Sequence, residues 1–198
     1  MTPPRILRAG AGEARRVAEL VATAFADLPQ VAWLVPDPAV RSRIMTDNFQ
    51  IFVDHAVEYG EIHLLDDHSG VAVWFDRTAP GPSPKDYDER LAAACAPYTQ
   101  RFQELDDLFD AHHPELPHQH LAFLAVHPGR QGSGLGTALL EHQHARLDEA
   151  GLPAYLEAST ARSRELYLRH GYRPLGEPFH LGDCATPFWP MWRGRFER

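Results

Sequence analysis

The sequence contains few cysteines, no run of basic residues and no long apolar segment. Its 198 residues include two cysteines, Cys95 and Cys184, in no paired motif, which argues against a disulfide scaffold and a cysteine-based zinc site. The formal net charge is −8 at pH 7, so we expect no nucleic-acid partner, because such proteins carry a basic patch. No apolar stretch reaches the length of a membrane span, and the first residues lack the apolar core of a signal peptide. We therefore expect a cytoplasmic protein that does not bind membranes.

What is present is an ordinary globular composition, with 44% hydrophobic and 23% charged residues. A chain of this length can bury one sizeable core, so we expect a single domain over residues 1–198. The hydrophobic spacing alternates between helix and strand periods along the chain. The pattern predicts helices over 12–27, 39–59, 135–150 and 161–171, and strands over 4–9, 61–67, 71–76, 120–126, 153–159, 172–177 and 188–195.

Three segments have a more specific expectation. Residues 28–38, "LPQVAWLVPDP", are bounded by prolines and are expected to form a loop. Between Leu91 and Phe109, apolar residues recur every three or four positions, which predicts one helical stripe. The run 120–126, "HLAFLAV", is almost continuously apolar and predicts a central strand buried on both faces.

A glycine-rich turn follows that strand, with Gly132, Gly134 and Gly136 at alternate positions. Backbone N–H groups at a helix N-terminus attract anions, and the absence of a Cβ lets a phosphate approach closely. One phosphate-binding motif, the P-loop, has lysine where this sequence has Leu135, so the turn does not match a P-loop. A dinucleotide fingerprint remains open: Thr137 replaces its third glycine, but Glu157 ends the next strand, where a ribose-binding acid would lie.

The third phosphate motif is an acyl-CoA loop. "LAVHPGRQGSGLGTALL" resembles the Q/R-x-x-G-x-G/A signature of the GNAT superfamily of N-acetyltransferases, with Gln131, Gly134 and Gly136 in its positions. The stretches "AFADLPQ", "VAVWFD", "AGLPAYLEAS", "LYLRHGY" and "WPMWR" extend the resemblance towards the puromycin N-acetyltransferase-like branch. The resemblance implies an α/β fold: a mostly antiparallel, strongly twisted sheet with a splayed central strand pair, flanked by helices. A poorly matched helical insert covers about residues 84–113.

The same resemblance implies transfer of the acetyl group of acetyl-CoA, as co-substrate, to the amine of a small molecule. It places Tyr167 near the thioester sulfur, where its phenol can protonate the leaving thiolate, and Glu157 is one candidate base. Related sequences often have Asn at the position of Ser163. The cofactor-binding residues implied are Leu124, Ala125, Val126, Gln131, Gly132, Ser133, Gly134, Leu135, Gly136, Ser163 and Tyr167.

On the acceptor side, His118 and His120 lead into the central strand and can take a proton directly or through water. Trp33 and Trp74 are candidate walls of the acceptor pocket. The stretch "DAHHPELPHQH" holds four histidines, but its spacing matches no zinc motif, so we expect no metal. An acyl-CoA-binding or sensor module without turnover is the alternative function, and a nicotinamide oxidoreductase is a more distant one. The sequence does not indicate the acceptor or the oligomeric state.

Overall fold

The structure is a computed structural model, and it describes residues 4–195 of the chain. The outermost residues of the expected domain, 1–3 and 196–198, lie outside the described part. The strands are β1 (Ile6–Arg8), β2 (Gly60–Leu65), β3 (Gly70–Arg77), β4 (His118–Val126), β5 (Ala154–Ala158), β6 (Arg173–Pro174) and β7 (Trp189–Arg193). The helices are α1 (Ala14–Phe25), α2 (Pro29–Leu34), α3 (Pro38–Tyr59), α4 (Tyr87–Cys95), α5 (Thr99–His112), α6 (Leu135–Ala150) and α7 (Ala161–Arg169), with a 3₁₀ turn, η1, over Pro128–Arg130.

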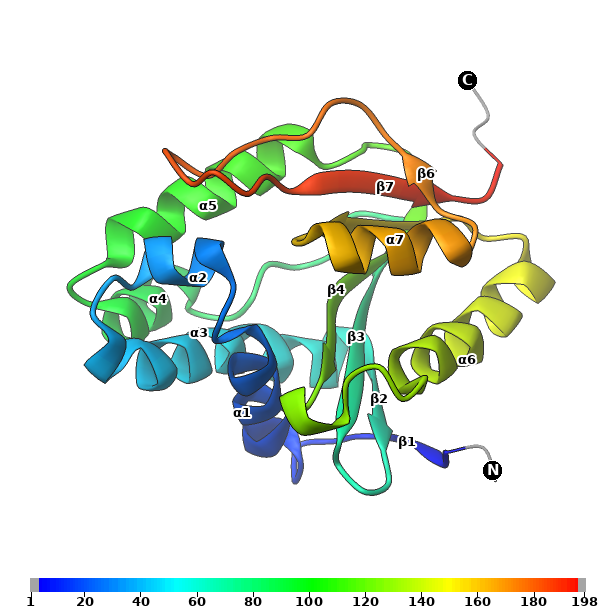
Figure 1. Cartoon of the computed structure of the whole chain (residues 1–198), viewed down its shortest axis with the longest axis horizontal. Coiled ribbons are helices and arrows are strands. Elements are labelled where there is room, and N and C mark those ends of the chain that lie inside the picture. The colour runs from blue at the N-terminus through cyan, green and yellow to red at the C-terminus, as the bar shows by residue number, and fades with distance from the viewer. Residues whose placement is uncertain (1–3, 196–198) are drawn as a thin grey trace.

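These strands form one sheet in the order β1-β2-β3-β4-β5-β7-β6. All neighbours are antiparallel except β4 and β5, which are parallel. In Figure 1, β6, β7 and α7 lie at the top of the molecule, and β1, β2 and α1 lie at the bottom. The mixed α/β fold and the mostly antiparallel sheet predicted from the sequence are confirmed.

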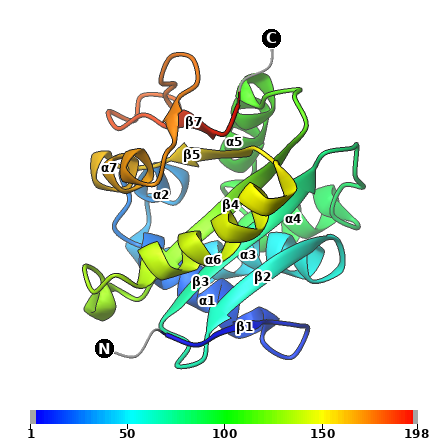
Figure 2. The ribbon, with the colours of Figure 1, turned by 90° about the vertical axis from the view of Figure 1, so that its right-hand side faces the viewer.

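Helices cover both faces of the sheet because its strands alternate two sets of apolar side chains. On β3, Val71, Val73 and Phe75 join one core cluster with α1 and α3, while Ala72 and Trp74 join a second cluster with α6. Figure 2 shows α6 in front of the strands and α1 and α3 behind them. Side chains that alternate along the strand therefore pack against a helix layer on each face of the sheet.

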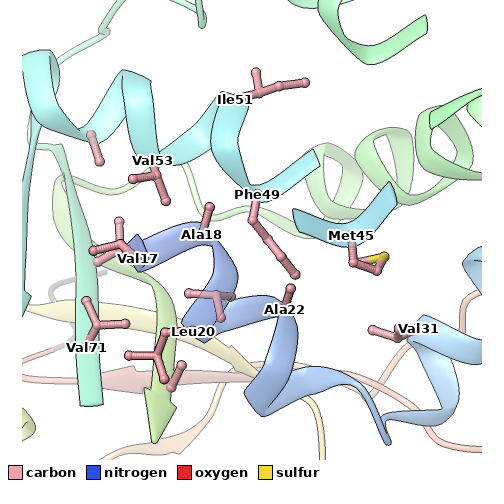
Figure 3. Close-up of a cluster of buried hydrophobic side chains, with 14 of the residues drawn as sticks. Val17, Ala18, Leu20, Ala22, Val31, Met45, Phe49, Ile51, Val53 and Val71 are labelled. Carbon is pink, nitrogen blue, oxygen red and sulfur yellow. The ribbon is translucent and has the colours of Figure 1, made fainter. Parts of the chain in front are cut away.

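The contact between α1 and α3 is the centre of the first cluster. On α1, Val17, Leu20 and Val21 recur at helical spacing and are buried. Phe49 of α3 lies beside Ala18 and Ala22 of α1, and Val71 of β3 faces the same cluster (Figure 3). This packing holds α1 and α3 under the strands that carry the site.

Two sequence expectations about helical segments are wrong. Residues 28–38 are not simply a loop, since Pro29–Leu34 form α2; proline at the first helical position has its φ angle preset for a helix, so Pro29 starts an element instead of ending one. The stripe from Leu91 to Phe109 is not one helix, because the chain breaks between α4 and α5. Pro97 cannot continue a helix and disfavours helical geometry at the residue before it, and Ala96 is indeed non-helical, with a ψ angle of 138°.

The central strand pair separates soon after it forms. Only Gln119↔Ala154 and His120↔Tyr155 pair between β4 and β5 among the described residues. Beyond His120 the two strands diverge, as the predicted splayed pair requires. The β3–β4 register also shifts, from Val73↔Phe123 to Trp74↔Leu121, so β4 has an extra residue there. Ala122, Phe123 and Leu124 are only half-buried, because this part of β4 lines a cavity and is not covered on both faces.

Within residues 4–195, no helix has both the length and the apolar character needed to cross a membrane.

Candidate functional site

A cavity of about 1440 Å³ opens where β4 and β5 diverge. Its walls come from the glycine turn and α7 on one side, and from α1, α3, α4 and α5 on the other. The helical segment that the sequence marked as an insert, about 84–113, therefore forms part of this cavity. The polar groups in a large, mostly apolar cavity of this kind are the first candidates for catalytic or binding residues.

The glycine turn occupies one end of the cavity. Gly132 and Gly134 have φ angles of +79° and +86°, a region that side chains with a Cβ rarely adopt. Gly134 is the N-cap of α6 and brings no side chain to the first N–H groups of that helix. Those groups have no partner within the helix itself, so the turn presents donors and the positive end of the helix dipole. This arrangement suits a phosphate group.

Arginine side chains surround the same end. Arg130, Arg162 and Arg169 all line the cavity. A Cβ at Gly132 would lie 3.5 Å from Nη2 of Arg162, which places this guanidinium directly beside the turn. Arg130 also pairs with Asp67 at 3.3 Å, an exposed contact that orients it. The cations give the turn charge complementarity to a polyanionic ligand.

Side chains in the turn hold its shape. Gln131 donates from Nε2 to the carbonyl of Val126 at 3.2 Å, linking the turn to the end of β4. The hydroxyl of Ser133 donates to the carbonyl of Arg130. Ser163 completes a capping box with Thr160 at the start of α7, with Ser163 N donating to Thr160 Oγ1 at 2.9 Å. The Ser163 hydroxyl is therefore already engaged in the cap.

Glu157 and His120 form the polar centre of the cavity. They lie on neighbouring strands at the divergence, and His120 Nε2 is 3.1 Å from Glu157 Oε2. Only 9% of the Glu157 side chain is exposed. Burial pushes the pKa of Glu157 upward, but the charge and hydrogen bond of His120 outweigh it, and the pKa is held below its usual value. Because the carboxylate is ionised and accepts, His120 Nε2 donates, and in the neutral form of the ring the lone pair then lies on Nδ1.

Two more histidines surround this pair. His113, which follows α5, places Nδ1 3.9 Å from Glu157 Oε1. His118 Nδ1 lies 2.6 Å from the carbonyl of Leu116, and its ring packs 5.0 Å from that of His113. Burial lowers the pKa of His113 to about 3 and that of His118 to about 4. Both rings are therefore neutral at pH 7, and the Glu157 carboxylate is the charged group among them.

Three of these side chains form a potential donor set for a metal ion. His113, His120 and Glu157 each offer one atom, and these atoms lie within 4.8 Å of one another. Two imidazoles and a carboxylate are donors that zinc accepts. The geometry is thus available, although the sequence spacing predicts no metal.

Tyr167 reaches the cavity from α7. It is 7% exposed and lines the cavity, and its ring contacts that of Tyr172 edge-on at 5.7 Å. Burial raises the pKa of the Tyr167 phenol above its usual value. The hydroxyl is therefore protonated at pH 7.

Most of the residues predicted for cofactor binding meet at this cavity, whereas both tryptophans predicted for the acceptor side do not. Trp33 donates from Nε1 to Asp183 Oδ1 at 2.7 Å and stacks under Arg101, so it joins α2 to other segments. Trp74 points to the opposite face of the sheet and packs against His144. The predicted residues that line the cavity are Leu124, Val126, Gln131, Gly132, Gly134, Leu135, Gly136, Glu157, Ser163, Tyr167, His118 and His120.

Two predicted cofactor residues lie apart from the cavity wall. The Ala125 side chain is buried in the core with α1 and α3, so only its backbone is available. Ser133 is exposed and does not line the cavity. Sequence reasoning also missed His113, Arg162 and Arg169; the two arginines are seven positions apart, on one face of the predicted helix that carries Ser163 and Tyr167, a signal that could have found them.

Comparisons with known proteins give a family match over part of the chain and a likeness in fold over all of it. Residues 99–174 match the family model described as "Acetyltransferase (GNAT) domain", a span that includes the glycine turn, Glu157 and Tyr167. The chain is 27% identical to a solved structure from Corynebacterium glutamicum, described as "histone acetyltransferase HPA2 and related acetyltransferase". That likeness covers 100% of this chain and 99% of the other, with a TM-score of 0.75.

Two more distant structures share the fold. Arylalkylamine N-acetyltransferase 2 from Aedes aegypti is 15% identical over 96% of this chain and 98% of its own, with a TM-score of 0.57. The PaiA N-acetyltransferase from Thermoplasma acidophilum, solved in complex with coenzyme A, is 7% identical over 96% and 98%, with a TM-score of 0.58. The comparisons thus match residues 99–174 to a GNAT acetyltransferase domain and give the chain the fold of solved acetyltransferases, while the puromycin N-acetyltransferase-like branch stays a prediction.

Proposed function

We propose that this protein is an N-acetyltransferase that moves the acetyl group of acetyl-CoA to the amine of a small molecule. One observation carries the proposal: a phosphate-binding turn and a buried proton-accepting pair line the same cavity, on either side of the strand divergence. The GNAT match over residues 99–174 and the neighbour bound to coenzyme A support the choice of co-substrate.

The residues present fit coenzyme A. The N–H groups at the start of α6 and the guanidiniums of Arg130 and Arg162 would hold its phosphates. The unpaired edge of β4 beyond His120 offers backbone groups to its extended arm. When bound, acetyl-CoA supplies an activated acetyl group as a thioester.

Glu157 and His120 deprotonate the acceptor in this proposal. A free alkylamine has a pKa near the lysine value of ~10.4, so it must lose a proton before its nitrogen can attack a carbonyl. His120 carries a free lone pair on Nδ1, a buried atom without a partner among the described residues. Glu157 holds the ring through Nε2 and stabilises the imidazolium that forms. Tyr167 then donates its proton to the departing thiolate.

The test is release of the coenzyme A thiol across a panel of primary amines. We expect release that depends on both acetyl-CoA and an amine, and that follows saturation kinetics in the amine. A protein that binds acetyl-CoA, measured by a rise in melting temperature, yet releases no thiol with any amine would be a binding module instead. Stronger stabilisation by NAD than by acetyl-CoA would overturn the assignment of the turn.

Glu157→Gln is expected to lower kcat/KM roughly tenfold to a hundredfold, with acetyl-CoA affinity unchanged. The amide can still accept from His120 Nε2, so the ring stays in place, but it cannot stabilise an imidazolium. The loss is smaller than a full general-base contribution of ~10²–10⁴ because His120 remains. Steady-state kinetics with a fixed amine measure the change.

Glu115→Gln is the matched control for that variant. Glu115 also lines the cavity but is exposed, and it makes no hydrogen bond or ion pair with another of the described residues. The same loss of charge there should leave kcat/KM within about twofold. Equal losses in both variants would mean that the net charge of the cavity matters and that Glu157 takes no part in proton transfer.

Removing metal ions is expected to leave the activity unchanged. The proposed reaction needs no metal, so dialysis against EDTA should not lower kcat. Added Zn²⁺ should inhibit, because His113, His120 and Glu157 would bind it with the atoms that proton transfer needs. Activity that is lost with EDTA and restored by Zn²⁺ would contradict the proposed base.

A further inference from the structure

The part of the cavity opposite the glycine turn has an aromatic wall. Phe52 of α3 contacts Phe123 of β4 at 6.1 Å between ring centroids and Tyr87 of α4 at 5.8 Å, both edge-to-face. Phe49 contacts Phe123 at 5.1 Å in the same manner. These rings come from three separate elements and form one continuous surface.

The rings of this wall face the cavity and do not only pack the core. Phe52, Tyr87 and Phe123 are each only partly buried, and each lines the cavity. Phe123 points there because the extra residue at the β3–β4 register shift breaks the alternation of β4, so that Ala122 and Phe123 both face the α1 and α3 side. Large rings left partly exposed in a cavity mark a binding surface for an apolar group.

An acidic group is attached to the same wall. The Tyr87 hydroxyl donates to Asp106 Oδ2 at 2.6 Å, and Asp106 also lines the cavity. Asp106 forms no ion pair with any cation within residues 4–195, and its charged neighbours Asp107 and Asp110 are acids too. Burial, together with these acids, raises the pKa of Asp106 to about 6 despite the hydrogen bond from Tyr87. The carboxylate is still mostly ionised at pH 7, and a second anion nearby would be unfavourable.

On the basis of the proposed function, we propose that the acceptor is an arylalkyl amine without a carboxylate group. Its aromatic ring packs against Phe52, Phe123 and Tyr87, and its amine reaches His120 and Glu157. Edge-to-face contacts favour an aromatic ring over a saturated ring of the same size. Asp106 favours an acceptor that enters as a cation and disfavours one that carries an anion.

Three matched acceptors test the proposal with the wild-type chain and acetyl-CoA. Phenylethylamine and cyclohexylethylamine differ in aromaticity, and phenylethylamine and phenylalanine differ in one carboxylate. We expect kcat/KM for phenylethylamine to exceed that for cyclohexylethylamine about fivefold, and that for phenylalanine at least about tenfold. An unbranched aliphatic diamine should be poorer than all three ring compounds.

Two variants locate the effect. Phe52→Leu should lower the ratio of kcat/KM for phenylethylamine to kcat/KM for cyclohexylethylamine. Any loss of folded protein lowers both values equally and therefore cancels in this ratio. Asp106→Asn should narrow the preference for phenylethylamine over phenylalanine at least about threefold. Asp107→Asn, an exposed neighbour on α5 that does not line the cavity, should leave the preference unchanged.

The outcomes separate this inference from the proposed function. No thiol release with any amine would refute the acetyltransferase itself. Faster transfer to the aliphatic diamine would leave the acetyltransferase intact and overturn the aromatic acceptor. Preference for phenylalanine would also overturn the proposal, and Arg77, a cation on the cavity wall beside Phe75, would then be the group that binds its carboxylate.

Discussion

Replacing Tyr167 with phenylalanine is expected to lower kcat at least about a hundredfold while acetyl-CoA affinity changes little. The ring stays and keeps its contact with Tyr172, so the packing of α7 survives. Only the proton donor is lost, and general acids typically contribute ~10²–10⁴ in rate. The loss should appear in kcat as well as kcat/KM, because the proton is needed mainly in the transition state.

Acyl donors with different leaving groups give a second test of Tyr167→Phe. The reference pKa of a thiol is ~8.5 and that of a phenol is ~10. A departing thiolate needs a proton donor most when its own pKa is high and when it is poorly solvated. Because Tyr167 is buried, its hydroxyl can donate a proton only to a thiolate that departs beside it. An acyl donor with a more acidic thiol should therefore narrow the gap between wild type and Tyr167→Phe.

Tyr172→Phe is the control for Tyr167→Phe. The Tyr172 hydroxyl lies 3.1 Å from His144 Nε2 and is fully buried, so its removal should lower the melting temperature. It does not line the cavity, so kcat in the folded protein should stay near the wild-type value. Near-normal kcat in Tyr167→Phe, with lowered stability, would make Tyr167 a core residue like Tyr172.

Gly134→Val is expected to remove measurable binding of acetyl-CoA. Nothing lies within 4 Å of a Cβ at this position, so the side chain would project into open space at the start of α6. That space is where we place the phosphates, next to the first N–H groups of the helix. Isothermal titration calorimetry with acetyl-CoA measures the loss directly.

Backbone strain needs a separate control, because valine is unfavourable at a φ angle of +86°. Gly176 has a φ angle of +77°, also with nothing within 4 Å of a Cβ, and lies outside the cavity. Gly176→Val should therefore cost similar stability but retain acetyl-CoA binding. Unchanged affinity in a folded Gly134→Val variant would refute the phosphate site.

Local patterns in the sequence predicted the parts of the site that are continuous in the chain. The turn, the helix from Leu135 and its C-terminal Gly151 follow from glycine positions and apolar spacing, and all are confirmed. The divergence of β4 and β5 came from the family resemblance, since no spacing encodes which strands separate. Glu157 was found at a strand end, but its hydrogen bond to His120 was not predicted.

The remaining differences arise from contacts distant in sequence. Trp33 and Trp74 were assigned to the acceptor pocket by residue type, but the direction of a side chain depends on which sheet face or helix it packs against. His113 joins Glu157 across 44 positions only because α5 ends beside the start of β4. The aromatic wall likewise unites α3, α4 and β4, and no single segment shows it.

The most direct test of acetyl transfer follows an isotope-labelled acetyl group from acetyl-CoA by mass spectrometry, with phenylethylamine as acceptor. We expect one labelled N-acetyl amine for each coenzyme A thiol released, and a strongly reduced yield at early times with Glu157→Gln and Tyr167→Phe. Thiol release with the label appearing as free acetate would mean hydrolysis. An unlabelled amine, with acetyl-CoA bound and intact, would contradict the account at its centre.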